Sequence, residues 1–495
     1  LTPEQARSAI SAMMIVTQKF DPEGKPIKIK SRYVARGNEM PAPEDRSSVS
    51  SPTVSLSSLF MVAAIAAKEN REVITVDIAG AYLNAEMKNI DVFIRIDREI
   101  AALLVKTAPE FARFLHPKNG VIYVKLKKAL YGCQESALLW FRHICATLRT
   151  MGFNQNPHDP CVFNMTVDGK QITVVLYVDD LFLSSMCPKL TERLLKLLEA
   201  TYKEIKVHRG DKLPYLAMLF DYSVKGQVSI TMEGYVVDTL KMVNGSLGRA
   251  STPATLYLFD IDEDSPLLDQ DTKMHFHSVV AKLYYLAKRV RPDILTSCSF
   301  LVTRVSAPTL QDYGKLMRTL AYLSGTRMMG IVLRPFDGLL HLFAHIDASF
   351  ANHKDMRSQG GIVITLGKGP VFVRATKQSL VTKSSAEAEM VALADGLTYV
   401  IWSRDFLIAQ GYELGPATVY QDNQATIAMA KRGPTNSGKS KHINLRYYWV
   451  TDRLQTGEIK LEYLKSEDMI SDILTKPLQG AQFRRLRDML LNWAY

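Results

Sequence analysis

The fold is decided by the stretch Gln171-Ile172-Thr173-Val174-Val175-Leu176-Tyr177-Val178-Asp179-Asp180-Leu181-Phe182-Leu183. Its apolar flanks, 171–176 and 181–183, predict two buried strands, and the acidic pair lies where a tight turn is expected. Two carboxylates at the tip of a buried hairpin repel each other and need a counter-charge, which a pair of Mg²⁺ ions would supply. The alternative is an acidic surface turn, because aspartate is common in turns.

A third carboxylate follows another apolar strand. Asp77 ends the strand expected at 73–76, so it can meet the acidic hairpin across a sheet. Three carboxylates around two metals suit nucleotidyl transfer, in which metals roughly 3.5–4 Å apart bind the attacking and leaving oxygens. Tyr82 follows a turn at Gly80. We expect its ring either to stack under a nucleotide sugar and exclude a 2′-hydroxyl, or to be an ordinary half-buried aromatic.

Size and composition fit a large globular protein. A chain of 495 residues predicts about two to four domains, and 47% hydrophobic with 22% charged residues is ordinary for folded proteins. The net charge of +11 favours a polyanionic partner, with nucleic acid as the first candidate.

Cysteine usage and hydropathy bear on the compartment. The five cysteines are scattered and include no CxxC pair, which argues against a disulfide framework or a zinc site. This pattern favours a reducing intracellular compartment, either a cytoplasmic particle or the nucleus. The longest apolar stretch, 56–67, is short and contains Ser57 and Ser58, so we expect neither a membrane span nor a signal peptide. A start at Leu1 instead of methionine suggests a processed product or a fragment of a polyprotein.

The patterning indicates an α+β chain whose C-terminal part is a second α/β domain. An acidic segment at 253–271 is expected to be a linker or an exposed loop, and 276–325 is helical with a break at 291–293. We expect strands at 14–20, 28–35, 341–346, 361–366, 371–375 and 417–421, a turn at 21–24, and helices at 55–69, 137–151, 190–202 and 385–410.

Nine short motifs succeed one another along nearly the whole chain. They are SRYVARG (31–37), DIAGAYLN (77–84), KALYG (128–132), DPCVF (159–163), LYVDDL (176–181), RPDI (291–294), YLSGT (322–326), SAEAE (385–389) and SDILTKPL (471–478). In content and order they resemble the reverse transcriptase and ribonuclease H region of copia-type (pseudovirus) LTR retrotransposons. The resemblance implies a right-hand polymerase (fingers, palm and thumb) followed by a ribonuclease H-like α/β domain. We place these at 1–245 and 336–495, with a mostly helical connection at 246–335.

The resemblance also implies roles for individual residues. The metal ligands of the polymerase would be Asp77, Asp179 and Asp180, with two Mg²⁺ ions per site and Mn²⁺ as a substitute. Lys30, Arg32 and Arg36 look like the grip on the triphosphate, since guanidinium forks suit phosphate oxygens; a solvated basic strand is the alternative.

One position departs from the family. Glu135 stands where a glutamine usually faces the incoming nucleotide. A carboxylate there would repel a triphosphate unless a metal or an arginine compensates.

A second set of acids, Asp347, Glu389, Asp422 and Asp472, has the order found in ribonuclease H, where four carboxylates hold two Mg²⁺ ions and a water attacks the RNA strand. We prefer Glu389 to Glu387 because it precedes the apolar run 390–393, as in the family. Each acid taken alone could be a solvated carboxylate. Expected contacts with nucleic acid, each weighed against solvated surface, are Lys377, Lys383, Lys439, Lys441 and His442.

The expected function is therefore an RNA-directed DNA polymerase with ribonuclease H activity. Its partners would be an RNA template, a DNA primer, deoxynucleoside triphosphates and the RNA–DNA hybrid. The rival is a catalytically decayed or host-adopted element that only binds nucleic acid. Glu135 and the start at Leu1 favour the rival, whereas the seven intact acids argue against it.

Overall fold

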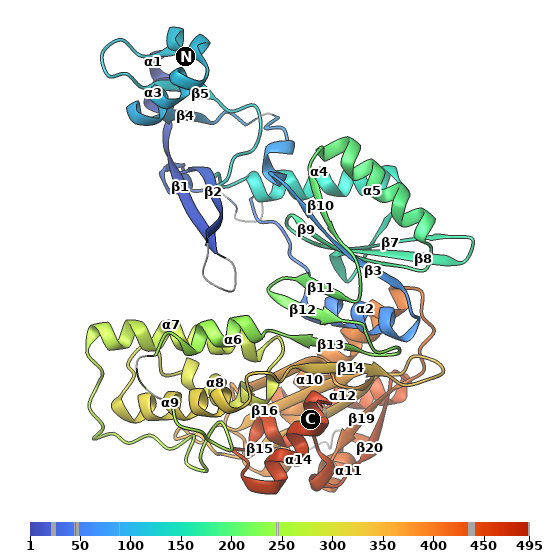
Figure 1. Ribbon diagram of the computed structural model, residues 1–495. Helices are drawn as coiled ribbons and strands as arrows, with labels where there is room; N and C mark the ends of the chain where they lie inside the picture. The colour runs from blue at the N-terminus through green and yellow to red at the C-terminus, as the bar shows by residue number, and fades with distance from the viewer. Residues whose placement is uncertain are drawn as a thin grey trace.

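The computed structural model describes residues 1–20, 26–43, 45, 49–88, 90–243, 245, 247–433 and 441–493. Its described strands form four sheets joined and covered by helices, which confirms the α+β class (Figure 1). The predicted turn at 21–24 lies outside the described residues. Among the described helices, none is both long and apolar enough to cross a bilayer.

The first sheet has the order β2-β1-β4-β5 and is accompanied by two helices. Its elements are α1 (Pro3–Arg7), β1 (Ile10–Phe20), β2 (Pro26–Ala35), β4 (Phe93–Ile96), α3 (Arg98–Thr107) and β5 (Ile122–Lys125). The strands predicted at 14–20 and 28–35 are confirmed as an antiparallel pair, although both begin earlier. This pair projects as a ribbon into the open side of the molecule (Figure 1), and Val16 and Ile29 are exposed on it.

Gly132 fixes the base of this ribbon. Its φ is +92°, and a Cβ there would lie 2.0 Å from the Ala35 carbonyl oxygen. The Ala35 amide in turn donates to the Tyr131 carbonyl at 2.7 Å. The 128–132 motif therefore needs glycine because β2 passes directly against it.

The second sheet carries the acidic hairpin and has the order β10-β3-β9-β8-β7-β6. Helices α4 and α5 lie on one side of it and α2 on the other (Figure 1). Because both faces are covered, β8 is buried continuously from Ile172 to Leu176. The bounds are α2 (Leu56–Lys68), β3 (Glu72–Ile78), α4 (Ser136–Thr150), β6 (Asn154–Asn156), β7 (Asp159–Val167), β8 (Lys170–Tyr177), β9 (Asp180–Ser185), α5 (Pro188–Tyr202) and β10 (Ile205–His208).

The third sheet combines strands that are far apart in the sequence. Its order is β11-β12-β13-β14-β17, with β11 (Lys212–Tyr215), β12 (Met218–Asp221), β13 (Val228–Thr231), β14 (Ile331–Pro335) and β17 (Gly367–Lys368). It thus draws strands from all three predicted domains. The boundaries at 245 and 335 remain predictions.

The helical region consists of α6 (Glu233–Leu240), α7 (Gln270–Ala287), α8 (Leu295–Val302) and α9 (Leu310–Gly325). The break predicted at 291–293 is present, and 303–309 interrupts the helices a second time. At the first break, Arg291 and Asp293 form a fully buried ion pair of 2.8 Å. Tyr322 donates to the same Asp293 carboxylate at 2.7 Å, so α9 is tied to the break.

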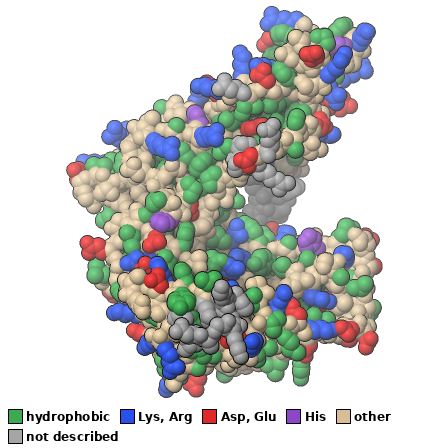
Figure 2. Space-filling model, turned by 180° about the vertical axis from the view of Figure 1, so that it is seen from behind, with side chains coloured by type: hydrophobic (Ala, Val, Ile, Leu, Met, Phe, Trp, Pro, Cys, Tyr) green, Lys and Arg blue, Asp and Glu red, His purple; other side chains and the backbone are tan. Residues whose placement is uncertain are grey.

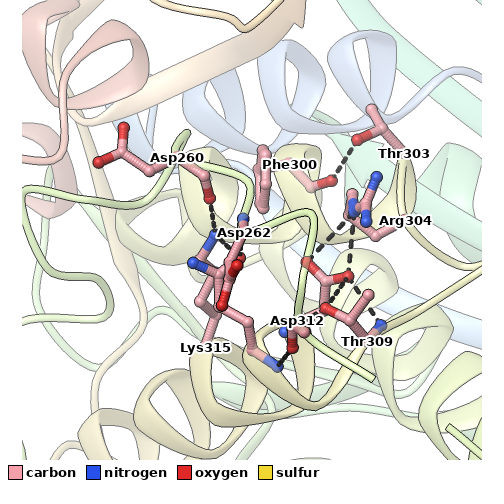
Figure 3. A network of polar contacts seen from close by, with 10 residues as sticks. Asp260, Asp262, Phe300, Thr303, Arg304, Thr309, Asp312 and Lys315 are labelled. Carbon is pink, nitrogen blue, oxygen red and sulfur yellow. Dashed lines mark hydrogen bonds and ion pairs between the residues drawn. The ribbon is translucent and has the colours of Figure 1, made fainter. Parts of the chain in front are cut away.

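The expectation of a linker or exposed loop at 253–271 is confirmed in part, because 253–269 is irregular and many of its residues are exposed. It is wrong in two details. Gln270 already begins α7, and the irregular part is packed against α8 and α9, with Leu258 and Phe259 buried. The Lys315 ammonium donates to the Asp260 carbonyl, and Arg304 pairs with Asp312 at 3.0 Å beside it (Figure 3). Apolar side chains within an acidic stretch therefore anchor this segment.

The fourth sheet has the order β18-β16-β15-β19-β20. The first three strands are antiparallel, and β19 and β20 join in parallel. The predicted strands and long helix are confirmed in β15 (Phe343–Ser349), β16 (Gln359–Thr365), β18 (Pro370–Lys377), α10 (Ser385–Ala409) and β19 (Ala417–Gln421). The remaining elements are α11 (Gln424–Arg432), α12 (Lys441–Gln455), β20 (Ile459–Tyr463), α13 (Asp472–Thr475) and α14 (Gly480–Leu491).

The end of α10 packs against the second sheet. Asn156 donates to the Phe406 carbonyl at 3.1 Å, and Gln171 donates to the Gln410 carbonyl at 2.6 Å. Beyond the helix, the Tyr412 hydroxyl lies 2.9 Å from the Arg71 guanidinium. These contacts hold the two acid-bearing sheets in one body.

Candidate active sites

Strand pairing brings the first three acids together. β3 and β9 are antiparallel, with Asp77 opposite Asp180, and Asp179 lies in the turn between β8 and β9. In that turn Val178 has a φ of +55°, which is unfavourable for a β-branched residue. Trp140 donates its indole N–H to the Val178 carbonyl, and the Asp179 carbonyl accepts from Ile78 at 3.0 Å. The surrounding structure thus holds a strained turn that presents two carboxylates.

The electrostatics of the first site call for cations. Burial, together with the charges of Asp179 and Asp77, raises the pKa of Asp180 to about 6. Burial also raises the pKa of Asp179, with a contribution from Asp77, while Lys30 and Arg32 act in the opposite direction. An all-oxygen set of acids short of positive charge suits hard divalent ions.

A pocket of about 580 Å³ opens in front of Asp77 and Asp179. Lys30 and Arg32 line it from β2, two residues apart and hence on one face of the strand. The Arg36 guanidinium is elsewhere, 3.9 Å from the Glu39 carboxylate, and Arg36 is not among the residues that line this pocket. The structure therefore groups two of the three predicted phosphate-binding residues with the acids.

Two tyrosine rings adjoin the acids. Tyr82, in the short helix Ala81–Asn84, lies with its ring centroid 4.8 Å from that of Tyr131. Burial raises the pKa of both tyrosines, and the nearby Asp179 raises it further. The Arg32 guanidinium lies 5.8 Å from the Tyr131 ring centroid. Our reading of the sequence missed Tyr131, although its position in the 128–132 motif is a signal for it.

Glu135 is placed differently from the expectation drawn from the family. It precedes α4, its Oε2 atom is buried without a hydrogen-bond partner among the described residues, and it is not one of the residues lining the pocket. Its neighbour Gln134 donates to the Gly37 carbonyl at 3.0 Å. A contact between Glu135 and a nucleotide stays a prediction.

Four elements converge on the second site. β15 and β19 are parallel and pair up to His345 and Tyr420, so Asp347 and Asp422 follow two residues later at the same edge. Asp472 begins α13. One carboxylate oxygen from each of these three acids lies within 4.8 Å of the others. Among the described residues, Asp77, Asp179 and Asp180 do not bring one oxygen each within 4.8 Å of the others.

Glu389 completes this cluster from the first turns of α10. Its carboxylate accepts a hydrogen bond from Gln421 at 3.2 Å. Burial raises its pKa well above the ordinary value, and Asp347 and Asp422 contribute. Glu387, by contrast, accepts from the Lys383 backbone amide at 2.7 Å at the helix start, which supports the preference for Glu389.

The second site is also deficient in positive charge. Burial, together with the charge of Asp347, raises the pKa of Asp472 to about 7. The Asp347 Oδ1 atom is buried and accepts no hydrogen bond from the described residues, which leaves it free for a ligand. Carboxylate oxygens with one buried, unpartnered acceptor fit a divalent cation.

Lys476 was missed from the sequence and is the cation of this cluster. Its ammonium lies 2.8 Å from Asp472 Oδ1 and 3.6 Å from Asp347 Oδ2. Although burial opposes its charged form, Asp347 and Asp472 raise the pKa of Lys476 above its ordinary value. The signal in the sequence is its position four residues after Asp472.

The predicted nucleic-acid contacts differ in their surroundings. Lys377 and Gly360 both line a pocket of about 310 Å³. Gly360 pairs with Ala348, the residue after Asp347, so this pocket is near the second acid site. The Lys377 ammonium is 2.7 Å from the Asp355 carboxylate. Lys383 is exposed near the start of α10. Lys439 and the side chains of Lys441 and His442 lie outside what the structure describes.

Comparisons with known proteins cover the whole chain. Residues 2–244 match the family "Reverse transcriptase (RNA-dependent DNA polymerase)". The chain is 26% identical over 486 residues to the retrovirus-related Pol polyprotein from transposon RE1 of Arabidopsis thaliana, covering 97% of this chain and 32% of that protein. It is 24% identical over 507 residues to the transposon TyH3 Gag-Pol polyprotein of Saccharomyces cerevisiae, covering 98% and 27%. The chain therefore spans about a third or less of the length of these relatives.

Solved structures also match. A foamy viral protease-reverse transcriptase in complex with double-stranded DNA aligns over 92% of this chain and 65% of its own, with 11% identity and a TM-score of 0.49. An N-terminal RNase H domain from Mycobacterium tuberculosis, solved as a fusion with maltose binding protein, aligns over 28% of this chain, with 16% identity and a TM-score of 0.19.

Proposed function

Because residues 2–244 of this chain belong to the reverse transcriptase family, and the whole chain is related to copia-type Pol polyproteins, we propose that it is an RNA-directed DNA polymerase joined to a ribonuclease H. The observation that carries the polymerase is the pairing of β3 with β9. It places Asp77 opposite Asp180 beside a pocket lined by Lys30 and Arg32.

In the proposed polymerase site, Asp77, Asp179 and Asp180 hold divalent ions, Mg²⁺ by preference. Once bound, such ions activate the primer 3′-hydroxyl and neutralise the leaving pyrophosphate. Lys30 and Arg32 neutralise the triphosphate from β2, because an ammonium and a guanidinium suit its oxygens. The Tyr82 ring beside Tyr131 forms the floor on which the sugar rests.

In the proposed ribonuclease H site, Asp347, Glu389, Asp422 and Asp472 would hold divalent ions, which when bound would supply an activated water for attack on the RNA strand. Gln421 orients Glu389, and Ser466, which donates to Asp422 at 2.7 Å, orients that carboxylate. Thr475 donates to Asp347 Oδ2 and leaves Oδ1 free to bind an ion.

A group of cations at one pocket supports contact with the hybrid outside the two acid sites. Lys288 and Arg289 line this pocket of about 210 Å³ with residues 370–373 of β18, and Arg374 follows on the same strand. Burial lowers the pKa of Lys288, and the nearby Arg374 lowers it further. Lys288 and Arg374 each lie over a tyrosine ring. Cations held in this way suit backbone phosphates, which are contacted without regard to sequence.

The shape of the molecule leaves room for a duplex. In the space-filling view a notch opens between the lobe that carries β1, β2, β4 and β5 and the lobe that carries α7, and lysine and arginine side chains are visible on its edge (Figures 1 and 2). We place the template–primer duplex in this notch. Its affinity should fall steeply with added salt, because binding would release counterions.

The test is primer extension on an RNA template with Mg²⁺. The unsubstituted chain is expected to extend the primer, and Asp179→Asn is expected to abolish extension because one metal ligand is lost. Asp168→Asn is the matched control, since Asp168 is an exposed turn residue on the neighbouring hairpin. Absence of extension by the unsubstituted chain would favour the rival, a decayed or host-adopted element that only binds nucleic acid.

A further inference from the structure

One partly exposed cation contacts the second acid cluster. The Lys476 ammonium bridges Asp472 Oδ1 at 2.8 Å and Asp347 Oδ2 at 3.6 Å. Both carboxylates are almost completely buried, with 3% and 1% of their side-chain surface exposed, whereas 35% of the Lys476 side chain is exposed. The lysine therefore reaches the acids from the solvent side of the cluster.

The cluster has one cation for four acids. Among the described residues, Lys476 is the only lysine or arginine that forms an ion pair with any of Asp347, Glu389, Asp422 and Asp472. Three neutral side chains, those of Gln421, Ser466 and Thr475, also donate to these carboxylates, as does the Ala348 backbone amide. Buried carboxylates without a counter-charge are costly, so Lys476 has a strong electrostatic role when no metal is bound.

The backbone fixes where the ammonium can go. The Lys476 amide donates to the Asp472 carbonyl at 2.9 Å, which closes the turn of α13 and sets the spacing of four residues. The preceding residue, Thr475, donates to Asp347. Against this turn lies Gly361, where a Cβ would be 2.8 Å from the Ser471 carbonyl oxygen. With β16 packed this closely, α13 cannot shift to carry the lysine away from the acids.

We propose that Lys476 is a built-in counter-cation of the second acid site. It partly neutralises Asp347 and Asp472 while no ion is bound, and it repels a divalent ion that binds beside it, so it sets the affinity of the site for metal. This inference rests on the proposed ribonuclease H function of the same acids. The ion would bind through the free Oδ1 atom of Asp347, close to an ammonium that contacts Oδ2 of the same carboxylate, and like charges this close repel.

The proposal predicts effects of opposite sign. Without Lys476 the metal-free cluster loses its counter-charge, so the folded protein without metal becomes less stable. The affinity for a divalent ion rises, because no positive charge beside the site repels it. A lysine with a purely structural role would give a loss in both states. Lys476→Met removes the charge but keeps a chain of similar length. Lys460→Met is the matched control, on an exposed position of β20 in the same domain.

The experiment measures Mn²⁺ binding by electron paramagnetic resonance in an Asp180→Asn background, which impairs the first site. Lys476→Met is expected to bind Mn²⁺ about tenfold more tightly than the parent, as expected for removal of one nearby unit charge at a partly exposed position. Lys460→Met should match the parent. Thermal unfolding of Lys476→Met in EDTA should begin at a lower temperature than that of the parent, and Mg²⁺ should restore it.

Two results would overturn the inference, and they differ in what else they remove. If the parent binds Mn²⁺ at Asp347 and Asp472 but Lys476→Met binds it equally or more weakly, the counter-cation role is wrong and the metal site stands. If Asp472→Asn removes none of the Mn²⁺ binding of the parent, the proposed metal-dependent site is wrong, and the inference fails with it.

Discussion

At the scale of single residues, the most informative feature is a carboxylate that the fold makes costly to ionise. Burial, together with Asp179 and Asp77, raises the pKa of Asp180 to about 6. In the unfolded chain its pKa is about 3.9, so between these values the folded state binds more protons than the unfolded state. Stability of the metal-free protein should therefore fall as the pH rises from about 4 to 6 and then level off.

The substitution Asp180→Asn tests this. In EDTA at pH 8 it should stabilise the protein by roughly 1–2 kcal/mol, after discounting the shift for partial solvent exposure. The gain should become small near pH 4, where the folded aspartate is neutral and about half of the unfolded chains carry its charge. Urea unfolding at the two pH values measures it. A gain that is the same at both values would show that repulsion among the acids is not its cause.

Position 135 gives a second prediction at this scale. Glu135 does not line the pocket, so Glu135→Gln should leave the KM for deoxynucleoside triphosphates within about twofold of the unsubstituted value. Arg32 lines this pocket. Arg32→Ala should therefore raise the KM for deoxynucleoside triphosphates by about tenfold, because one charge-assisted contact with the triphosphate is lost. Steady-state primer extension provides both values. A large change for Glu135→Gln would place its carboxylate against the nucleotide after all.

At the scale of elements, local patterns of apolar residues predicted the strands and helices, whereas contacts that depend on tertiary packing were missed. The strands around Asp179 and Asp180 were predictable because their apolar runs are bounded by acids and turns. The order of Asp347, Glu389, Asp422 and Asp472 was recognised from the resemblance to ribonuclease H, and in the structure Asp347 lies within β15 and Glu389 in the first turns of α10. Lys476 was missed because only the folding of α13 against β16 brings it to the acids.

At the segment 253–271, the sequence predicted more solvent exposure than the structure shows. Its acidic composition predicted an exposed loop, but composition does not reveal that Leu258 and Phe259 are buried against α8 and α9. Tyr131 was likewise missed as a site residue: its motif marked the position, but its contact with Tyr82, which is far away in sequence, appears only in the fold.

A glycine pair tests how β2 is positioned. Gly132→Ala places a Cβ 2.0 Å from the Ala35 carbonyl, whereas Gly169→Ala, also at positive φ, meets nothing within 4 Å. Gly169→Ala should cost about 1 kcal/mol of stability from φ strain alone. Gly132→Ala should cost about 2–4 kcal/mol and lower primer extension more than hybrid cleavage, because β2 must move away from the pocket. Equal effects of the two substitutions would show that β2 does not depend on this close approach.

At the scale of the whole molecule, the sites lie on sheets that are tied to each other. The third sheet takes β11 to β13 from one half of the chain and β14 and β17 from the other. Around it, Asn156, Gln171 and Arg71 bond to the end of α10 and to Tyr412. This arrangement predicts that the two halves depend on each other for stability.

The corresponding experiment compares residues 336–495 with the entire chain by calorimetry. The intact chain should unfold in one main transition, and the fragment should unfold at a distinctly lower temperature or fail to remain soluble. The fragment lacks β14 and leaves the end of α10 without the second sheet. A fragment as stable as the intact chain would mean that the shared sheet contributes little.

The central claim is that one chain carries two separate metal-dependent sites. The most direct measurement follows one labelled RNA–DNA hybrid in Mg²⁺ and records primer extension and RNA cleavage together for Asp179→Asn and Asp347→Asn. The account predicts that Asp179→Asn loses extension and keeps cleavage, and that Asp347→Asn keeps extension and loses cleavage. Loss of both activities in either variant, with the fold intact by circular dichroism, would contradict it.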